Sequence, residues 1–593
     1  MRERLANYWP LAASLILIIV DQWLFMGICK ELRNPIGAAI KMCGDAAVIL
    51  LPYWYLPPRW RWSVIAPVWA LTLLLTCSLL NYRAFADILS PMALTMTGNV
   101  NSAVLPSILS LIRPIDFAFC AAAAVFTFCI FRYRSSYIGE RFSLRTKLSA
   151  TLLSILLYLL SQVGLSWSHR NFFRDEIGMD VTLREATRLR LSDHIFTHIG
   201  DYEGNGLLLH SWRAVAEAIE YMDIRRELTD EQRQEIRSFL SEPAIAPDTA
   251  ATTNRKKNII LILTESLNSY AIETTIDGHE VTPVLRWLID QPGTVSALNV
   301  VSQIADGTSS DGQLMTNTGL LPLRRGVVGL MVGSSNRFIA LPERLERASA
   351  SVVFGENGAT WNKVPTFANW GFTSHTIADF QQEADAKGID GALMDFALDL
   401  IPQLEQPYLL ELVTMSTHMP FATDGMEVPS WLTAAEGLEE IERNYLTTVN
   451  YFDAQLGRLI EDLHAQGIWD DCILIVASDH SSPNALPKGH DAIYPADIPM
   501  TFIAANTHLT DAVERTVGQI DIYPTILYLT GYYADGEYNG LGTPIVCADL
   551  RSAYTFTRGL IGDSDSPLSW LQTEAAKISE LIVRGDYFRQ EEF

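Results

Sequence analysis

The sequence predicts a two-part protein: an N-terminal domain of five transmembrane helices, then an α/β domain with a largely parallel sheet. The first third of the 593-residue chain contains five long apolar stretches, and the second half alternates short apolar runs with helical patterns. The mean hydropathy of +0.13 is high for a soluble protein. Because the chain is too long for one ordinary domain, we expect a membrane domain over 1–168, a helical connector over 169–254 and the α/β domain over 255–593.

Each apolar stretch approaches the roughly 20 residues that a membrane-spanning helix needs. The first contains Asp21, which is costly in lipid and is expected to face a neighbouring helix. The second contains Lys41 and Asp45, whose spacing of four residues would let them pair on one helix face. The five stretches are Trp9–Ile28, Ile36–Tyr55, Trp62–Leu80, Ile115–Phe131 and Leu148–Trp167.

The distribution of positive charges predicts the orientation of these helices, because loops rich in Lys and Arg stay in the cytoplasm. The basic segments precede the first stretch and follow the second and the fourth, so they fall on one side: Arg2, Arg4, Arg59, Arg61, Arg132, Arg134, Arg141, Arg145 and Lys147. The first stretch lacks an A-x-A-like cleavage site, which favours an uncleaved anchor. We therefore expect a multi-pass protein of the cytoplasmic (inner) membrane, with everything after Trp167 extracytoplasmic.

Net charge and cysteine usage exclude some classes of function. The formal net charge is −24, so a nucleic acid partner would be repelled. Five of the seven cysteines lie near the N-terminus in or beside apolar segments, where they act as small hydrophobes. Cys472 and Cys547 remain, and their spacing indicates neither a zinc motif nor a disulfide framework.

The connector contains helical signals. Ser211–Met222 mixes apolar and polar residues at helical spacing, and Thr229-Asp-Glu-Gln is typical of a capped helix start. Pro243, Pro247 and the run over 248–253 indicate a flexible break. The simplest role for this segment is to position the α/β domain over the bilayer.

Three apolar runs predict buried strands of the α/β domain. They begin at Asn258, Cys472 and Ile498, and a helical pattern covers Ile441–His464. In such sheets, active-site groups gather beyond the carboxyl ends of the strands. Two polar clusters stand in that position, because Glu265 follows the first strand and Asp479-His480 follows the second.

A third cluster, Gly307-Thr-Ser-Ser-Asp-Gly, supplies hydroxyl groups. Carboxylates and an imidazole suit a divalent cation, and a hydroxyl bound to such a cation loses its proton more easily and becomes a nucleophile. Each cluster taken alone is also typical of an ordinary loop. Together they predict a metal-dependent site with a hydroxyl nucleophile.

These residues resemble the motifs of the alkaline phosphatase/sulfatase superfamily. The motifs here are Glu265 in LTESL, Ser309 in GTSSDGQ, His418 in TMSTHMPF, Asp479-His480 in SDH, and the late segment that starts at Gln519. The whole chain is similar to the lipoteichoic acid synthase branch of membrane phosphoglycerol transferases. That branch has five spans, a helical connector and an extracytoplasmic sulfatase-like domain, which is therefore the α/β fold expected here.

The resemblance implies a role for each matching residue. Glu265, Ser309, Asp479 and His480 would bind the metal, and Ser309 would also be the nucleophile. The family commonly has Thr before Ser-Asp, so Thr308 is the alternative nucleophile and Ser310 a third choice. His418 would contact the substrate phosphate or give a proton to the leaving group, with a structural loop histidine as the alternative. Mn²⁺ is the metal that the family implies, although Zn²⁺ or Mg²⁺ would suit these ligands too.

Trp361-Asn-Lys363 resembles a family Trp-Asn-Arg that would bind the phosphoglycerol head group. Lys in place of Arg loses the bidentate fork, and a family His before the Trp has no match in Phe354-Gly-Glu-Asn. His490 would line the site or lie in a surface loop. The identity of the head group therefore stays open.

The resemblance implies transfer of a phospholipid head group, most simply phosphoglycerol, through a covalent intermediate on Ser309 to a glycolipid or glycan acceptor. The alternatives are a phosphoethanolamine transferase, a membrane-anchored phosphodiesterase or sulfatase-like hydrolase, and a degenerate binding or sensing protein. No C/S-x-P-x-R motif follows Glu265, which disfavours a true sulfatase. Two scattered cysteines disfavour the disulfide-rich transferases that modify lipid A.

Overall fold

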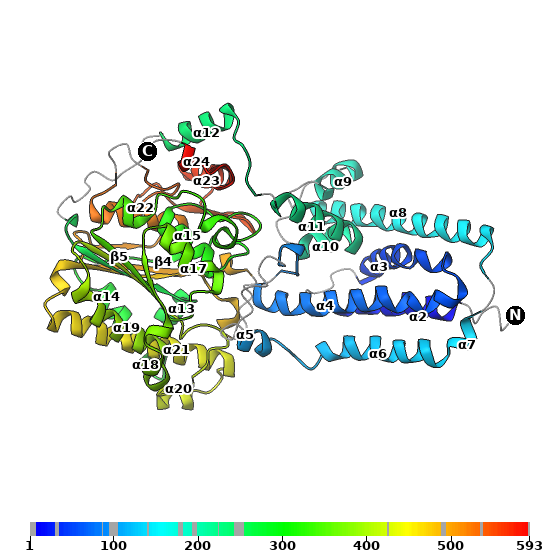
Figure 1. Cartoon of the computed structure of the whole chain (residues 1–593), viewed down its shortest axis with the longest axis horizontal. Helices are drawn as coiled ribbons and strands as arrows, with labels where there is room; N and C mark the ends of the chain where they lie inside the picture. Colours follow the sequence, from blue (N-terminus) through cyan, green and yellow to red (C-terminus); the bar gives the residue numbers. More distant parts are fainter. Residues whose placement is uncertain are drawn as a thin grey trace. The chain divides into compact units, whose positions relative to one another are not determined.

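A computed structural model describes residues 8–29, 35–85, 87–93, 105–138, 141–175, 182–191, 198–222, 224–241, 254–423, 426–487, 494–533 and 538–590. The chain divides into two compact units. The first comprises residues 1–91 and 108–220, and the second comprises residues 92–107 and 221–593. Figure 1 shows the first unit as a bundle of helices and the second as a sheet covered by helices.

The first unit contains a helix at each of the five predicted apolar stretches: α2 (Trp9–Cys29), α3 (Pro35–Ile49), α4 (Ile65–Phe85), α6 (Asp116–Arg132) and α8 (Leu144–Asp175). Helix α3 packs on α8 and α2, and α4 packs on α2 and α6. Short helices α5 (Leu105–Ser110) and α7 (Arg134–Tyr137) flank α6. As expected, Asp21 faces a neighbouring helix, where it accepts a hydrogen bond from the Thr72 hydroxyl at 3.2 Å.

Among the described residues, three helical segments are long and apolar enough to cross a membrane: Trp9–Cys29, Pro58–Arg83 and Leu144–Asn171. The predicted count of five is not confirmed. Helix α3 has 15 residues and α6 has 17, which is below the roughly 20 that a bilayer core requires. Proline explains the short α3, because a turn of 3₁₀ helix with Pro52 in its first turn follows Ile49.

The connector is helical: α9 (Leu183–Leu191), α10 (His198–Asn205), α11 (Leu207–Met222) and α12 (Asp230–Leu240). The predicted capped start at Thr229 is confirmed. The Thr229 hydroxyl accepts from the Gln232 amide at 3.2 Å, and the Gln232 side chain accepts from the Thr229 amide at 3.0 Å. The predicted break over 243–253 lies outside the described residues.

The second unit is an α/β domain around one large sheet, as predicted. Its strand order is β10-β4-β9-β8-β1-β7-β5-β6, with β11 also paired to β4. Every pairing in this sheet is parallel except those of β9 with β4 and β8. The strands are β1 (Asn258–Thr264), β4 (Val295–Val301), β5 (Ser349–Phe354), β6 (Thr373–His375), β7 (Tyr408–Val413), β8 (Cys472–Ser478), β9 (Met500–Ala505), β10 (Asp511–Val513) and β11 (Val517–Gly518). The three runs predicted as strands are thus β1, β8 and β9.

Helices cover both faces of this sheet (Figure 1). Alternate residues of β1, β7 and β8, such as Ile260, Leu410 and Leu474, form one core with α14, α19 and α21. Besides α12, the α-helices of this unit are α13 (Ser269–Glu273), α14 (Pro283–Ile289), α15 (Ser309–Thr318), α16 (Leu341–Arg344), α17 (Lys363–Asn369), α18 (Gln381–Lys387), α19 (Ile389–Leu400), α20 (Ser430–Ala434), α21 (Glu440–Ala465), α22 (Ile522–Thr530), α23 (Ser569–Gly585) and α24 (Tyr587–Gln590). Two hairpins complete it: β2 (Thr275–Ile276) with β3 (His279–Glu280), and β12 (Ser552–Thr555) with β13 (Gly559–Gly562).

Candidate active site

The central strands bring the predicted polar clusters to one edge of the sheet. Strand β1 lies between β8 and β7, and all three run parallel. Thr264 pairs with Ser478, and Leu263 pairs with Val413, so the strands end at the same level. The residues that follow these ends are Glu265 after β1, Asp479-His480 after β8 and the loop containing His418 after β7. The topology therefore gathers residues that are more than 200 positions apart in the sequence.

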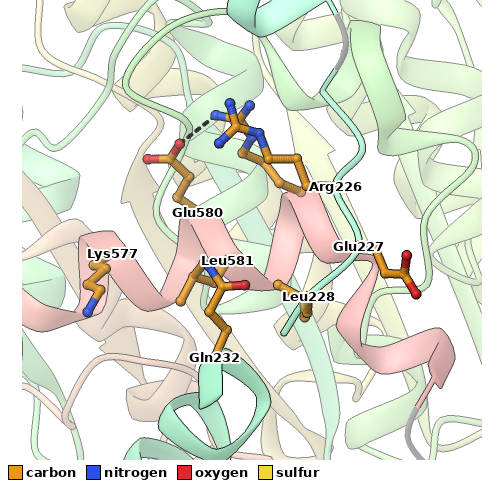
Figure 2. A pocket seen from close by; sticks show the side chains of 8 residues that line it. Arg226, Glu227, Leu228, Gln232, Lys577, Glu580 and Leu581 are labelled. Carbon is orange, nitrogen blue, oxygen red and sulfur yellow. Dashed lines mark hydrogen bonds and ion pairs between the residues drawn. The ribbon is translucent and has the colours of Figure 1, made fainter. Parts of the chain in front are cut away.

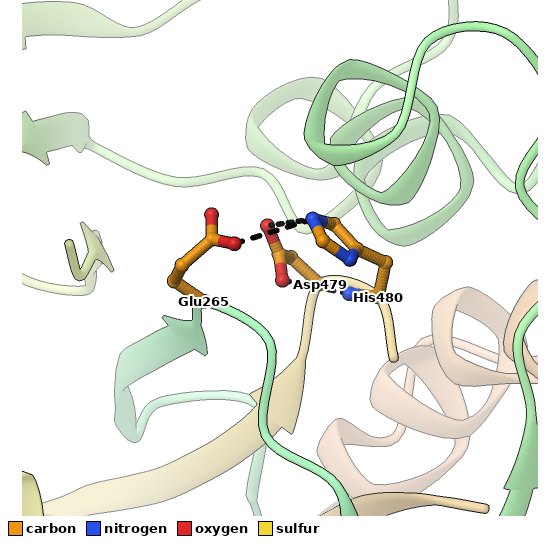
Figure 3. Close-up of side chains that lie close together, drawn as sticks. All are labelled: Glu265, Asp479 and His480. Atoms are coloured by element: carbon orange, nitrogen blue, oxygen red, sulfur yellow. Dashed lines mark hydrogen bonds and ion pairs between the residues drawn. The ribbon is translucent and has the colours of Figure 1, made fainter. Parts of the chain in front are cut away.

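Glu265, Asp479 and His480 form a cluster of potential metal ligands (Figure 3). Their ligand atoms all lie within 4.8 Å of one another. The Nε2 atom of His480 is 3.3 Å from a Glu265 carboxylate oxygen and 3.8 Å from Oδ2 of Asp479. Two buried carboxylates that share one site repel each other, so a positive charge between them is favoured.

The surrounding hydrogen bonds orient these side chains toward a common point. Asp479 Oδ1 accepts from the backbone amides of Ser266 at 3.0 Å and of His480 at 2.7 Å. Its Oδ2 is buried and has no hydrogen-bond partner among the described residues. His480 Nδ1 lies 3.0 Å from the Ser481 carbonyl oxygen, and an Nδ1 proton donated to that carbonyl would leave Nε2 as the ligand atom. An orphaned carboxylate oxygen, a second carboxylate and an oriented imidazole fit a divalent cation.

The pKa values of the cluster reflect the same charge balance. Burial, together with the charge of Glu265, raises the pKa of Asp479 to about 6. Burial would lower the pKa of His480, but the carboxylates of Asp479 and Glu265 outweigh it and raise that pKa to about 10. Burial would raise the pKa of Glu265, yet the imidazoles of His480 and His418 hold it well below its usual range. A positive charge is thus strongly favoured here, whether a proton or a metal ion supplies it.

Ser309 is the hydroxyl residue that contacts this cluster. It is the first residue of α15, and its Oγ donates a hydrogen bond to Oε2 of Glu265 at 3.3 Å. The positive end of the helix dipole therefore lies at the Ser309 hydroxyl, where it would stabilise an alkoxide or a phosphoryl group. Helix α15 also passes close to the backbone of Asp479. Glycine at position 312 permits this, because a Cβ on Gly312 would lie 2.1 Å from the Asp479 carbonyl oxygen.

The two alternative hydroxyl residues are placed differently. Thr308 precedes the helix with φ 40° and ψ −112°, a strained conformation for a β-branched residue. The Ser310 hydroxyl lies beside Gly329, where an added Cβ would meet it at 2.7 Å. The described contacts of the cluster include the hydroxyl of Ser309 but not that of Thr308 or Ser310.

Asp311 shapes the loop in front of the nucleophile, a role that the sequence did not indicate. Its Oδ2 accepts hydrogen bonds from the backbone amides of Ala305 and Gly307, both at 2.9 Å. A side chain at Gly307 would collide with this carboxylate, since an added Cβ would lie 2.2 Å from Oδ1. Asp311 thereby fixes the turn that presents Ser309.

Gln519 holds the backbone of Asp479, one of the potential metal ligands. Its amide nitrogen donates to the backbone carbonyl of Asp479, and its side-chain oxygen accepts from the backbone amide of Gln303 at 3.4 Å. The sequence had matched this segment to a helix start of the superfamily, and α22 does begin at Ile522. The specific contact with Asp479 appears only in the structure.

His418 lies in the loop after β7, close enough for its charge to lower the pKa of Glu265. Its Nδ1 is 2.6 Å from the Met419 carbonyl oxygen, and this contact fixes the orientation of the ring. The neighbouring Thr417 hydroxyl donates to the Glu265 carbonyl, so the His418 loop is tied to the metal cluster.

The Trp361-Asn-Lys363 segment lies near the start of α15. The Trp361 carbonyl oxygen approaches Gly329, where an added Cβ would lie 3.0 Å from it, and the same glycine borders Ser310. The Asn362 side chain donates to the Gly329 carbonyl at 3.2 Å. Lys363 is buried and forms an ion pair with the buried carboxylate of Glu356. The sequence predicted a role for Lys363 but not its ion pair with Glu356.

Backbone strain is concentrated around these residues. Among the described non-glycine residues, nine have positive φ. Five of them stand beside predicted site residues or belong to them: Ser266, Thr308, Trp361, Asn362 and Phe421. Such conformations cost of order 1–3 kcal/mol each and are typical of functional sites. His490, the remaining candidate, lies outside the described residues.

A separate pocket of about 180 Å³ lies between α12 and α23 (Figure 2). Its charged side chains include Lys577, which pairs with Glu235, and Arg584, which pairs with Glu580 at 2.9 Å. No member of the metal cluster lines this pocket. We interpret it as a gap in the packing between the connector and α23, the last long helix.

Two family models match the chain in the regions that the structure separates. The model described as sulfatase matches residues 257–532, and the model described as lipoteichoic acid synthase N-terminal domain matches residues 26–175. The first contains the metal cluster and Ser309, and the second runs from the last turn of α2 to the end of α8.

Curated relatives agree with these matches. Lipoteichoic acid synthase 2 of Bacillus subtilis is 28% identical over 323 residues, which cover 51% of this chain and 49% of that protein. The chain thus spans about half the length of this relative. Lipoteichoic acid synthase of Staphylococcus saprophyticus is 24% identical over 521 residues, which cover 84% of this chain and 77% of that protein.

Among solved structures, the lipoteichoic acid synthase LtaP from Listeria monocytogenes aligns with 59% of this chain and 98% of its own. The TM-score of this alignment is 0.48 and the sequence identity is 18%.

Proposed function

Because the chain is a lipoteichoic acid synthase-like protein of the alkaline phosphatase superfamily, we propose that it transfers a phospholipid head group to an acceptor hydroxyl. The reaction would take place outside the cytoplasmic membrane, with the first unit as a five-span membrane domain. One observation carries the proposal: the Ser309 hydroxyl hydrogen-bonds to Glu265 within the cluster that Asp479 and His480 complete.

In the first step, Ser309 Oγ attacks the phosphorus of the phospholipid. The Ser309 hydroxyl gives its proton to the Glu265 carboxylate to which it hydrogen-bonds. A bond forms between Oγ and phosphorus, and the bond from phosphorus to the diacylglycerol oxygen breaks. His418 gives its proton to that oxygen, so diacylglycerol leaves as a neutral alcohol. The head group remains as a phosphodiester on Ser309.

In the second step, the hydroxyl of a glycolipid or glycan acceptor attacks the same phosphorus. His418 now accepts the acceptor's proton, and the bond between phosphorus and Ser309 Oγ breaks. Glu265 returns its proton to Oγ, which restores the free hydroxyl of Ser309. With water as the acceptor, the same residues would catalyse hydrolysis, so the outcome depends on which hydroxyl reaches the intermediate.

Glu265, Asp479, His480 and Ser309 would hold a divalent cation, for which Mn²⁺ is our first choice over Zn²⁺ or Mg²⁺. When bound, that cation would lower the pKa of the serine hydroxyl and offset charge on the phosphoryl oxygens. The N-terminus of α15 acts in the same direction, because its dipole is positive at Ser309.

For the head group we propose phosphoglycerol first, from the resemblance of Trp361-Asn-Lys363 to a phosphoglycerol-binding motif. The ion pair between Lys363 and Glu356 favours phosphoethanolamine as a second candidate. Glu356 offsets the charge of the lysine that would attract the phosphate, and its carboxylate would instead suit an ammonium group. The scarcity of cysteines argues for the first candidate.

Mass spectrometry of the full chain can separate these cases. The purified protein would be incubated with a mixture of phosphatidylglycerol and phosphatidylethanolamine, quenched in acid and digested. We expect an added mass on the peptide containing Ser309, and the size of that mass identifies the head group. A peptide without added mass in the wild type, with diacylglycerol nevertheless released, would overturn the covalent mechanism. Ser309→Ala serves as the control and should carry no added mass.

A further inference from the structure

Helix α11 (Leu207–Met222) carries an apolar stripe that no described part of the protein covers. Trp212 is 71% exposed, Val215 43% and Ile219 63%, and Ala216 between them is also exposed. These positions follow the spacing i, i+3, i+4 and i+7, which places them on one face of the helix. The opposite face is buried through Leu207, His210, Ala214 and Ala218.

The buried face of α11 is held by Asp45 and Lys41 of α3. The Asp45 carboxylate accepts a hydrogen bond from the backbone amide of Leu207 at 2.8 Å, so it caps the first turn of α11. Lys41 donates to the backbone carbonyls of Tyr202 at 3.3 Å and Glu203 at 3.1 Å near the end of α10. Each charge has the sign that the adjacent helix dipole favours. Lys41 and Asp45 therefore both hydrogen-bond to the connector.

Further contacts fix the same segment to α4 and α8. The Asp87 carboxylate, just beyond α4, accepts from the backbone amides of His198 at 2.9 Å and Ile199 at 2.6 Å, at the start of α10. Gln162 of α8 donates to the Asn205 carbonyl at 3.2 Å. Helices α10 and α11 are thus docked on the apolar helices.

The docking places α10 and α11 beside a surface that is itself apolar and exposed. Val163 and Trp167 of α8 are 55% and 61% exposed and lie within two turns of Gln162. They belong to a helix that is long and apolar enough to cross a membrane. On α9, Arg184 and Arg188 are exposed, which suits anionic lipid head groups.

We propose that α11 is an interfacial helix whose stripe of Trp212, Val215, Ala216 and Ile219 inserts into the outer part of the lipid bilayer. An amphipathic helix with Trp on its apolar face is suited to the boundary between head groups and acyl chains. Continuity with the exposed side chains of α8 favours lipid over a protein partner. Helix α11 would then hold the connector at the surface of the bilayer.

Quenching by brominated lipid tests this proposal without reference to catalysis. The full chain would be reconstituted in vesicles of phosphatidylcholine and phosphatidylglycerol, with either ordinary or brominated acyl chains. The fluorescence of Trp212 is obtained as the difference between the wild type and Trp212→Phe. We expect this difference to lose most of its intensity in the brominated vesicles.

Trp287 is the matched control, because it is 45% exposed on α14 of the catalytic unit. Its contribution, from Trp287→Phe, should keep its intensity in both kinds of vesicle. Equal intensity of Trp212 in both vesicles, or equal quenching of Trp287, would overturn the proposal. So would a wild type that is dimeric in mass photometry with Trp212 unquenched, if Trp212→Ala is monomeric, since the stripe would then bind a second copy.

Discussion

The Oγ atom of Ser309 lies 3.3 Å from a carboxylate oxygen of Glu265, although 44 residues separate them in the sequence. The end of β1 fixes Glu265, and the first turn of α15 fixes Ser309. A nucleophile and a metal ligand are thus held by two independent elements that meet only in the folded domain.

Replacing Ser309 with Ala should reduce head-group transfer by about 1,000-fold or more, because the atom that attacks phosphorus is removed. Ser310→Ala is the matched control, since Ser310 has the same side chain one position later but lies beside Gly329. We expect that control to stay within about tenfold of the wild type. Release of diacylglycerol from a fluorescent phospholipid measures both. A larger loss in Thr308→Ala than in Ser309→Ala would move the nucleophile to Thr308.

Asp479→Asn should abolish stoichiometric metal binding. The change keeps the size of the side chain but removes the negative charge of the buried Oδ2 atom that faces Glu265 and His480. Elemental analysis by plasma mass spectrometry should find metal on the wild type and little on the variant. Chelator treatment of the wild type should remove activity, and Mn²⁺ should restore it. Unchanged metal content in Asp479→Asn would refute the assignment of this ligand.

Lys363→Met should destabilise the catalytic unit by about 3–5 kcal/mol, because it leaves the buried Glu356 carboxylate without its partner. The double variant Glu356→Gln with Lys363→Met should recover most of that loss, since neither charge remains. Thermal unfolding of the full chain in detergent measures both. If the double variant is no more stable than Lys363→Met, the ion pair is not what stabilises this segment.

Glu411 on β7 should make stability depend on pH. It is fully buried, and burial raises its pKa to about 8, although Asn317 and Lys363 nearby offset part of this rise. The folded chain therefore holds a proton up to about pH 8, whereas the unfolded chain releases it near the ordinary value of 4.5. Its contribution is complete below pH 4.5 and declines as pH rises through this window, by about 1.4 kcal/mol per pH unit.

Glu411→Gln stays neutral at every pH, so this slope should disappear in the variant. The free energy of unfolding would be compared between wild type and variant at several pH values from 4 to 9. The comparison matters because other buried acids, such as Asp453 and Asp521, also have raised pKa values. Identical slopes in the two proteins would show that Glu411 is ionised in the folded state or exposed.

Asp45→Ala should loosen the start of α11. The Asp45 carboxylate caps the Leu207 amide at 2.8 Å, and loss of such a cap costs about 0.5–2 kcal/mol, or about 2- to 30-fold in local opening. Hydrogen exchange of the peptide that contains Leu207 and Leu208 measures this directly. The peptide that contains β1 serves as an internal control and should exchange as in the wild type.

The sequence was sufficient to predict the elements whose pattern is local. Continuous apolar runs predicted β1 and β8, and the chemistry of the following residues predicted a metal site at Glu265, Asp479 and His480. The capping box at Thr229 was likewise readable, because its two hydrogen bonds join residues only three positions apart. Hydropathy predicted five membrane helices, and three are confirmed as long and apolar enough among the described residues, because α3 and α6 have only 15 and 17 residues.

The tertiary structure decided what depends on residues far apart in the chain. Which hydroxyl of Thr308, Ser309 and Ser310 contacts Glu265 depends on where α15 begins relative to β1. Lys41 and Asp45 each hydrogen-bond to backbone groups about 160 positions away. Spacing in the sequence cannot determine such contacts, because the folded chain sets these distances. The sequence by itself thus determined the kind of chemistry, and the fold determined which atoms are placed to perform it.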